Sequence, residues 1–341
     1  MIRIKVISHA LTGYGNGRGR DVVREDCIFL QDAHCRDYDW LVVYDDFPRA
    51  SVGSIRDETE PLACPSARTI LVTAEPPSIK IYPAPYTRQF GHVLTTHPRR
   101  FLSHPGYRIG RGCMYWMAGY SMDEVLSMPD RPKSRDVSAV CSAKRQRHTQ
   151  HRLRYRLMTY LTEHLEGFEW YGWGVRDIRC KYEALNDYRY HVAAENYIGD
   201  HHWSDKISDP LLALCLTFYA GDPKLAEILP AESFIPIPID DEKRALAVIR
   251  EAIARNEYER RLPAIREARR LIVEKYNFYQ QIVDLIHEQG VASAPQGACR
   301  RKGEHLLKGR HTLRRNPCNA LAEGVEILRY RTSALFDCTK H

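Results

Sequence analysis

The hydrophobic pattern changes character about a third of the way along the chain. In the first part, short runs of β-branched and aromatic residues alternate with Gly- and Pro-rich segments. These runs predict buried strands at Ile2–Ser8, Trp40–Tyr44 and Thr69–Thr73. A segment with two prolines and mixed charge, Ser127–Ser134, predicts a linker. We therefore expect a first α/β domain over residues 1–126, followed by a linker over 127–134.

Beyond the linker, strand-like and helix-like segments alternate regularly. In order, the expected strands are Asp136–Ser142, Phe168–Tyr171, Tyr190–Ala194, Leu216–Tyr219 and Phe234–Ile237, with helices at His151–Leu165 and Ser204–Ala213. This alternation predicts βαβ units and a parallel sheet, which binds ligands beyond the carboxyl ends of its strands. Apolar residues then recur at helical spacing from Asp241 onward and again over Ile265–His287, which predicts packing helices. We expect a second domain over residues 135–290 that includes them.

The net charge of +7 is concentrated at one end of the chain. Residues 291–341 hold ten basic and four acidic residues, a net charge of +6, so the other 290 residues together carry +1. A near-neutral body argues against a nucleic-acid partner. The pattern predicts a basic tail over 291–341. A solvated extension and a contact with the inner, anionic face of a membrane are both open.

Other bulk features point to a cytoplasmic globular protein. No apolar run approaches the ~18–20 residues that cross a bilayer. The first ten residues, MIRIKVISHA, lack the apolar core of a signal peptide. The ten cysteines occur singly, without metal-site spacing, which predicts reduced thiols and no metal centre.

Polar residues are densest between Lys181 and Ile207. Glu195 and Asn196 follow an expected strand, and Ser204-Asp205-Lys206 open an expected helix. A helix N-terminus with a lysine suits a phosphate group, and Asp205 could accept hydrogen bonds from a ribose diol. The same residues also fit an ordinary N-terminus with Ser204 as its cap, so both interpretations stay open.

Two further segments carry candidate chemistry. Lys144–Arg156 contains six basic residues and no acid, and it leads from an expected strand into a helix. One or two of these cations could face a pyrophosphate, and the others are expected to be solvated. Glu75 lies in a Pro-rich loop after the strand at Thr69–Thr73, a position where a carboxylate can act as a general base. A loop glutamate that is merely exposed has the same signature.

These segments form an ordered set of short motifs. In sequence order, they are Glu75-Pro-Pro-Ser78, Arg154, Tyr171-Gly172, Glu195-Asn196, Lys206 ten residues after Asn196, and Pro230-Ala-Glu-Ser-Phe-Ile235. Over residues 69–240 this order and spacing resemble the family 10 glycosyltransferases, the α1,3/α1,4-fucosyltransferases. The resemblance implies a GT-B-like α/β fold, with two Rossmann-like domains facing a cleft. We expect this fold to be followed by closing C-terminal helices and the basic tail, which lies outside the resemblance.

The resemblance also implies roles for individual residues. Glu75 would be the general base that deprotonates the acceptor hydroxyl. Arg154 and Lys206 would hold the pyrophosphate of GDP-fucose, Asp205 its ribose, and Asn196 and His202 the nucleotide side of the donor. Further candidates are Glu195, Lys181 and Arg152, the last because it lies two residues from Arg154. Transfer would proceed with inversion, without metal or cofactor, to a glycan, lipopolysaccharide or glycolipid acceptor.

The sequence departs from the family pattern at several of these positions. Asp205 stands where the family has Glu, and His202 where it has Tyr. The family glycine before the next strand is missing around Leu214–Leu216. Two alternatives follow: a transferase on this scaffold that uses another nucleotide-sugar, and a catalytically silent protein that binds a glycan or nucleotide.

Overall fold

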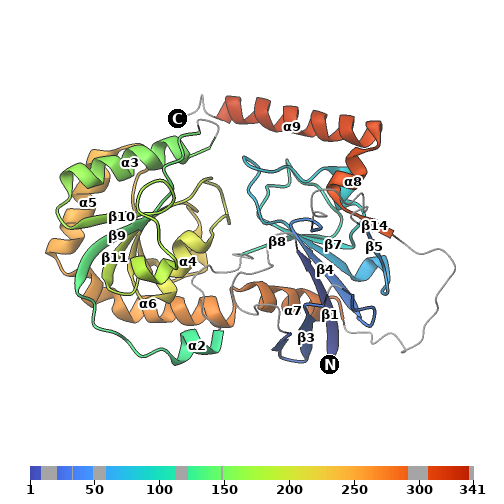
Figure 1. Ribbon diagram of the computed structural model, residues 1–341, viewed down its shortest axis with the longest axis horizontal. Helices are drawn as coiled ribbons and strands as arrows, with labels where there is room; N and C mark the ends of the chain where they lie inside the picture. Colours follow the sequence, from blue (N-terminus) through green and yellow to red (C-terminus); the bar gives the residue numbers. More distant parts are fainter. Residues whose placement is uncertain are drawn as a thin grey trace. The chain divides into compact units, whose positions relative to one another are not determined.

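The structure is a computed structural model that describes residues 1–8, 21–32, 34–48, 59–111, 122–146, 149–290 and 306–337. It forms two compact units (Figure 1). Of the described residues, unit 1 combines those up to residue 111 with the chain from Phe278 onward, and unit 2 consists of residues 122–277. Both units are built on a mainly parallel sheet with helices, which confirms the predicted α/β class. The cleft between two domains stays a prediction.

Unit 1 holds a seven-stranded sheet. Its order is β2 (Val22–Arg24), β3 (Cys27–Leu30), β1 (Ile2–Ser8), β4 (Trp40–Tyr44), β6 (Thr69–Val72), β7 (His92–Thr95) and β8 (Tyr107–Ile109). All neighbouring pairs are parallel except β2 with β3. The strand order reverses between β1 and β4, the place where open α/β sheets bind ligands. The three predicted strands are confirmed as β1, β4 and β6, the last ending one residue earlier.

Unit 2 holds a five-stranded parallel sheet. Its order is β10 (Phe168–Tyr171), β9 (Arg135–Val140), β11 (Tyr188–Ala194), β12 (Leu216–Ala220) and β13 (Phe234–Pro236). Its helices are α2 (Met122–Ser127), α3 (His151–His164), α4 (Asp205–Leu212), α5 (Glu242–Ala254) and α6 (Glu257–Glu274). α3 packs against β10 and α5, whereas α4 and α6 pack together against β12 (Figure 1). The order reverses between β9 and β11, so the ligand edge of unit 2 lies after these two strands.

Two local backbone conformations explain sequence features of unit 2. Gly172 has φ 127°, and a Cβ there would lie 2.6 Å from the Cys141 carbonyl oxygen, so only glycine fits. Leu214 adopts φ 57° directly after α4. This is the position where helices commonly end on a left-handed glycine. The resemblance led us to expect a glycine around Leu214–Leu216. At this turn the chain has a buried leucine, Leu214, in the left-handed conformation.

The unit boundaries differ from the predicted domains. α2 packs on α6 and belongs to unit 2, whereas the prediction placed residues up to 126 in the first domain. The apolar run Ile265–His287 is broken after Glu274, and α7 (Phe278–Glu288) packs on unit 1. Two aromatic rings of α7 pack against strands of unit 1. The ring centroids of Phe278 and Tyr44, in β4, lie 5.5 Å apart, and those of Tyr279 and Phe29, in β3, lie 4.8 Å apart. Helical periodicity identifies an apolar face but not the core against which it packs.

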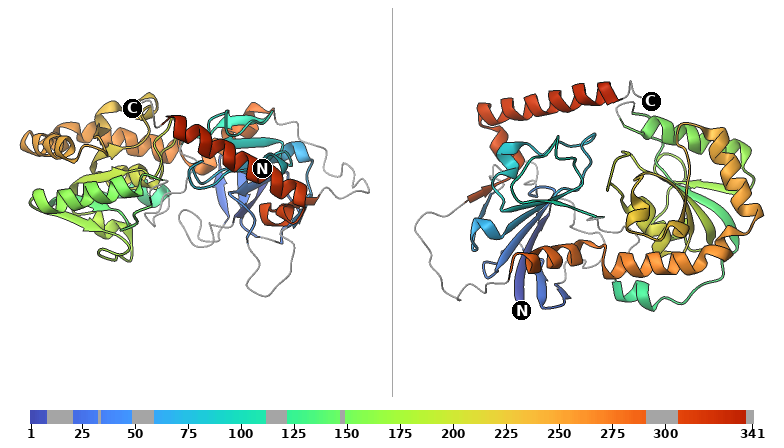
Figure 2. Two further views of the ribbon diagram at one scale, coloured as in Figure 1. Left: turned by 90° about the horizontal axis from the view of Figure 1, so that it is seen from above. Right: turned by 180° about the vertical axis from the view of Figure 1, so that it is seen from behind.

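The described part of the C-terminal tail is folded onto unit 1. β14 (Leu306–Lys308) pairs antiparallel with β5 (Thr59–Pro61), and Leu307 is buried. α8 (Arg310–Arg314) and α9 (Pro317–Asp337) follow, drawn in red in Figure 2. Buried Glu323 of α9 pairs with Arg310 of α8. A solvated extension is therefore wrong for residues 306–337. None of the described helices has the length and apolarity needed to cross a bilayer.

Candidate functional site

A buried carboxylate organises the ligand edge of unit 2. Glu195 follows β11 directly and is 0% exposed. It accepts hydrogen bonds from the Ser204 N–H at 2.9 Å and from the Ser204 hydroxyl at 2.8 Å. Gly221, at the end of the neighbouring strand, leaves the room for it, because a Cβ there would lie 2.8 Å from the Glu195 Cγ. Glu195, expected only as an additional candidate, thus fixes the start of α4.

Lys206 is held by the same network. Its Nζ lies 3.0 Å from the Ser204 hydroxyl oxygen and 3.4 Å from a Glu195 carboxylate oxygen. Ser204 also caps the helix by accepting from the Lys206 N–H at 3.4 Å. Ser204 is therefore a helix cap, as one interpretation predicted, and Lys206 is a positioned cation rather than a solvated one. The phosphate site stays a prediction. Its Nζ also lies 3.8 Å from an Asp205 carboxylate oxygen. The ammonium group thus donates to one hydroxyl and lies near two carboxylates.

A cluster of charged side chains lies beside Lys206, along the first two turns of α4. Lys181, from the short 3₁₀ helix Lys181–Ala184, pairs with Asp205 and, at 2.8 Å, with Asp209. Burial alone would lower the pKa of Lys181, but the two carboxylates outweigh it and the pKa is raised. Burial alone would raise the pKa of Asp205, but Lys181 and Lys206 outweigh it and the pKa is lowered well below the usual range. Lys181 and Asp205 are therefore both charged at neutral pH.

The cavity at this cluster is small. Its lining includes Lys181, His191, Asp205, Lys206 and Asp209, and its volume is about 10 Å³. That is the space of a single water molecule. A nucleotide contacting these residues would therefore lie outside this cavity, against the carboxyl edge of the sheet.

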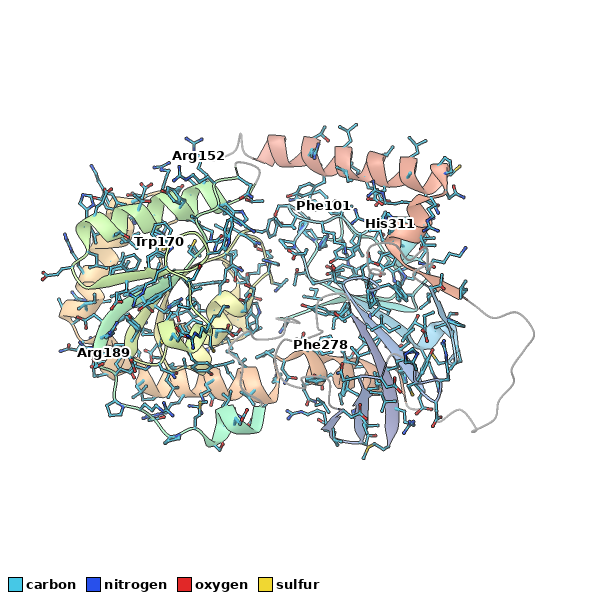
Figure 3. All side chains as sticks on the ribbon, viewed as in Figure 1. Phe101, Arg152, Trp170, Arg189, Phe278 and His311 are labelled. Carbon is cyan, nitrogen blue, oxygen red and sulfur yellow. The ribbon has the colours of Figure 1, made fainter. Side chains whose placement is uncertain are left out.

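Arg154 differs from every other cation at this edge. It lies one turn into α3, which follows β9 at the switch point, and it is 5% exposed. Its Nε has no hydrogen-bond partner, and its guanidinium has no ion pair within the described chain. Arg152 is exposed on α3 and lies on its outer side (Figure 3). Burial thus separates the two arginines that the sequence left as alternatives.

Backbone contacts bring α3 to the end of β11. The Gln150 N–H, at the start of α3, donates to the carbonyl of Asn196 at 3.2 Å. The structure therefore places Arg154, Asn196, Glu195 and Lys206 at one edge of unit 2. The basic segment before α3 is described except for residues 147 and 148, which lie outside the described residues.

His202 is more deeply placed than expected. Its side chain is 4% exposed and packs edge-on against the Tyr197 ring at 5.4 Å. Burial lowers the pKa of His202 to about 4, with Glu195 acting to raise it and Lys206 to lower it further. The imidazole is therefore neutral at pH 7 and shapes the loop between β11 and α4.

Glu75 lies in unit 1, three residues after β6. Its N–H donates to the Tyr82 hydroxyl at 3.2 Å, and its carbonyl lies 2.8 Å from the His97 Nε2. Tyr82 in turn donates to the buried Asp45, which Lys80 contacts at 3.0 Å. The loop that carries the predicted base is thus fixed by a network that the sequence did not indicate.

Residues that could hold a metal occur elsewhere in unit 1. Asp26, Cys27 and His287 place their ligand atoms within 4.8 Å of one another, and His287 Nε2 lies 2.9 Å from Asp26. Burial raises the pKa of the Cys27 thiol to about 12, so this cysteine is protonated at neutral pH. The seven cysteines of the described chain are all free.

The signal for Asp209 was present in the sequence. It stands four residues after Asp205, which places the two carboxylates on one face of a helix, and Lys181 contacts both. The Tyr82 and Asp45 network had no such signal, because its members are 37 residues apart.

No known protein family and no curated protein matches the sequence of this chain. Several solved structures do resemble its fold. An α1,3-fucosyltransferase crystallised with GDP-fucose is 15% identical, with 84% of this chain and 89% of that chain covered and a TM-score of 0.47. The DNA-modifying enzyme β-glucosyltransferase is 10% identical, with 83% and 100% covered and a TM-score of 0.46. A glycosyltransferase from Rickettsia africae is 8% identical, with 84% and 97% covered and a TM-score of 0.44.

Proposed function

We propose that this chain is an inverting glycosyltransferase that transfers L-fucose from GDP-fucose to a hydroxyl of an oligosaccharide or glycolipid acceptor. The observation that carries the proposal is Arg154, a buried guanidinium at the switch point of a parallel sheet, without a carboxylate partner in the described chain. A buried cation is costly unless it is paired, and an anionic ligand supplies that partner. The motif order from Glu75 to Pro230 supports the choice of donor.

The proposed chemistry is a single displacement. Glu75 takes the proton of the acceptor hydroxyl, whose oxygen attacks the anomeric carbon of fucose. The bond from that carbon to the phosphate oxygen breaks, and GDP leaves with the electron pair. Arg154 and Lys206 stabilise the negative charge that develops on the leaving group. Asp205, held ionised by Lys181, accepts hydrogen bonds from the ribose. This proposal involves no metal.

Calorimetric titration with GDP, UDP and CMP tests the donor. We expect GDP to bind more tightly than the other two. We expect Arg154→Met to weaken GDP binding at least about tenfold, because a charged hydrogen bond contributes about 1.5–3 kcal/mol. Arg152→Met is the matched control and should leave GDP affinity unchanged. Absence of GDP binding would overturn the GDP-sugar donor, and tighter UDP binding would favour the alternative donor.

A transfer assay with a panel of acceptors tests the enzyme. Glu75→Gln should lower turnover about 10²–10⁴-fold, the usual effect of removing a general base, while GDP affinity stays the same. A silent binding protein predicts GDP or glycan binding without any turnover in the unsubstituted chain. These outcomes distinguish an active glycosyltransferase from a protein that only binds GDP or a glycan.

We also propose that α9 contacts an anionic membrane surface. Leu321, Val325 and Leu328 recur at helical spacing and are 70%, 58% and 63% exposed. α9 itself carries two basic and three acidic residues, so the positive charge near it comes from Lys308, Arg310, Arg314 and Arg315, in β14, in α8 and directly after α8. Exposed leucines beside arginines are typical of helices that lie at a lipid interface.

Co-sedimentation with vesicles tests this contact. Binding to phosphatidylglycerol vesicles and not to phosphatidylcholine vesicles is expected. Replacing both Leu321 and Leu328 with serine should abolish it, and Val23→Ser, at an exposed residue of β2, should not. Equal sedimentation without vesicles or with either lipid would contradict it.

A further inference from the structure

Unit 2 contains a second cavity at the opposite edge of its sheet from Glu195 and Lys206. Its volume is about 430 Å³, within the range of small-molecule sites, about 300–1,000 Å³. Its wall includes residues 128–133, Asn186 and Leu212–Leu214, which precede β9, β11 and β12 respectively. The cavity therefore lies at the amino ends of the strands, whereas the proposed donor site lies at their carboxyl ends.

One face of α6 forms the rest of the wall. Tyr258, Leu262, Arg266 and Arg269 line the cavity at spacings of four, four and three residues, which places them on a single helical face. Arg269 is 8% exposed. The only hydrogen bond of its guanidinium in the described chain is to the Met128 carbonyl, at 3.3 Å. A guanidinium has five N–H donors, and those of Arg269 that do not contact Met128 are open to the cavity.

Neither acidic residue of the lining forms an ion pair with Arg269 within the described chain. Asp130 pairs with Arg266, and Glu259 lies 3.6 Å from Arg189; Figure 3 labels Arg189, which belongs to β11. Asp130 is near enough to act on Arg269 electrostatically, but burial has the larger effect and the pKa of Arg269 is lowered.

Two further cations line the cavity. The ammonium group of Lys133 donates to the carbonyls of Ala213, Leu185 and Asn186, at 2.8, 3.1 and 3.2 Å, so it is held in place without a carboxylate. Arg131 is exposed and has no ion pair in the described chain. Five basic and two acidic side chains line the cavity, which leaves a net charge of +3.

We propose that this cavity binds a small phosphate monoester, with the phosphate between Arg269 and Arg131 and the organic part against Tyr258 and Leu262. A phosphate monoester carries about −1.5 to −2 charges at pH 7 and so matches a net charge of +3 better than a singly charged carboxylate does. The guanidinium of Arg269 offers the paired donors that phosphate oxygens accept. The site is separate from the proposed donor site and does not depend on it.

Binding at this site joins two parts of unit 2. Arg131 belongs to the extended segment between α2 and β9, and Arg269 belongs to α6. A phosphate bound by both arginines adds to the existing contacts of α6 with this segment, from Arg266 to Asp130 and from Arg269 to Met128. The ligand thus favours the conformation in which residues 128–133 lie against α6.

Calorimetric titration of the full chain with phenyl phosphate tests the site. The unsubstituted chain should bind it with one site. Arg269→Met and Arg131→Met should each weaken binding at least about tenfold, the effect of losing one charged hydrogen bond. Arg131 is exposed, so its variant carries the test even if Arg269→Met fails to fold. Arg270→Met is the matched control, since Arg270 is the next residue of α6 but pairs with Glu267 and Glu274 outside the cavity.

Two further arms locate the ligand and identify its chemistry. Arg154→Met, at the proposed donor site, should leave phenyl phosphate binding unchanged, and Arg131→Met should leave GDP binding unchanged. Benzoate, a carboxylate of similar shape, should bind at least about tenfold more weakly than phenyl phosphate. The proposal is overturned if the unsubstituted chain does not bind phenyl phosphate, if Arg131→Met has no effect, if Arg154→Met has the same effect, or if benzoate binds equally well.

Discussion

The two units place a buried carboxylate at the same point of their sheets. Asp45 directly follows β4 in unit 1, and Glu195 directly follows β11 in unit 2. Each strand borders the point where the strand order of its sheet reverses. Asp45 is 8% exposed and Glu195 is 0% exposed, and each contacts one lysine. Both units thus have a buried carboxylate at the carboxyl end of a strand that borders the reversal of strand order.

The two carboxylates differ in what they hold. Asp45 acts through the Tyr82 hydroxyl, which receives the N–H groups of Ala74 and Glu75, so it fixes a loop. Glu195 acts through Ser204 and Lys206, so it fixes the first turn of a helix and a cation. In the proposed function, the loop carries the general base and the helix start belongs to the donor site. Four predictions test this difference.

The largest effect is expected in the ion cluster of unit 2. Lys181→Met removes the cation shared by Asp205 and Asp209 and leaves a buried carboxylate beside a partly buried one, which should cost about 3–5 kcal/mol of unfolding free energy. Urea unfolding measures it. Lys224→Met is the control, because the Lys224–Asp200 pair is about half exposed and should contribute less than about 1 kcal/mol. Equal losses in the two variants would show that the cluster is no more than a surface ion pair.

The second effect concerns pH and should also belong to unit 2. Burial lowers the pKa of His202 to about 4 and that of His191 to about 3. Between pH 6.5 and 4 the unfolded chain binds protons that these folded histidines do not. Stability therefore falls as the pH falls, by up to about 3 kcal/mol for each group at about 1.4 kcal/mol per pH unit.

Replacing one histidine measures how much it contributes to the pH dependence of the unfolding free energy. His202→Gln should reduce the stability difference between pH 7 and pH 4.5 by about 2 kcal/mol, and the exposed His164→Gln should leave it unchanged. Urea unfolding at both pH values measures the difference. At pH 4.5 the carboxyl of Asp205, with its lowered pKa, is still ionised. An unchanged difference in His202→Gln would mean that another group titrates.

The sequence predicted unit 2 well because its signals are local. β10 has the predicted bounds, α3 ends one residue early, and Ser204 is the cap of α4. The periodicity of apolar residues and the chemistry of a helix start both operate within about ten residues. The same reasoning placed Glu195, Asn196 and Lys206 at one edge, because a strand, loop and helix in a parallel sheet fix that edge.

What the sequence missed depends on contacts between distant residues. Tyr82 and Asp45 are 37 residues apart, and α7 returns to unit 1 after the whole of unit 2. The distinction between Arg152 and Arg154 needed the direction of each side chain on α3. The sequence showed that Lys181 is a cation but did not predict its ion pairs with Asp205 and Asp209. Each of these is decided by packing, for which a single sequence has no pattern.

The third prediction tests the loop of unit 1. Tyr82→Phe removes the hydroxyl that joins Asp45 to the backbone of Ala74 and Glu75, and should cost about 2 kcal/mol of unfolding free energy. Turnover in the transfer assay should fall while GDP affinity stays the same, because the variant loosens the loop that carries the proposed base. Tyr86→Phe is the control, since its buried hydroxyl contacts the Asp45 carbonyl at 3.5 Å and the Asp46 side chain, not the backbone of Ala74 and Glu75. Unchanged turnover would remove Tyr82 as a positioning residue.

The smallest effect tests the helix start of unit 2. Ser204→Ala removes an N-cap, which costs about 1 kcal/mol on average, and also a hydroxyl that donates to Glu195 and accepts from Lys206. Asp241→Ala removes the cap of α5 at an exposed position and supplies the cost of a cap alone. If Glu195 holds Lys206 through Ser204, the loss in Ser204→Ala should exceed that in Asp241→Ala, and Ser204→Thr should recover most of it. Equal losses of unfolding free energy would show that Ser204 is an ordinary cap. Asp45 and Glu195 would then share a position in their sheets, but Glu195 would not hold a cation through the helix start.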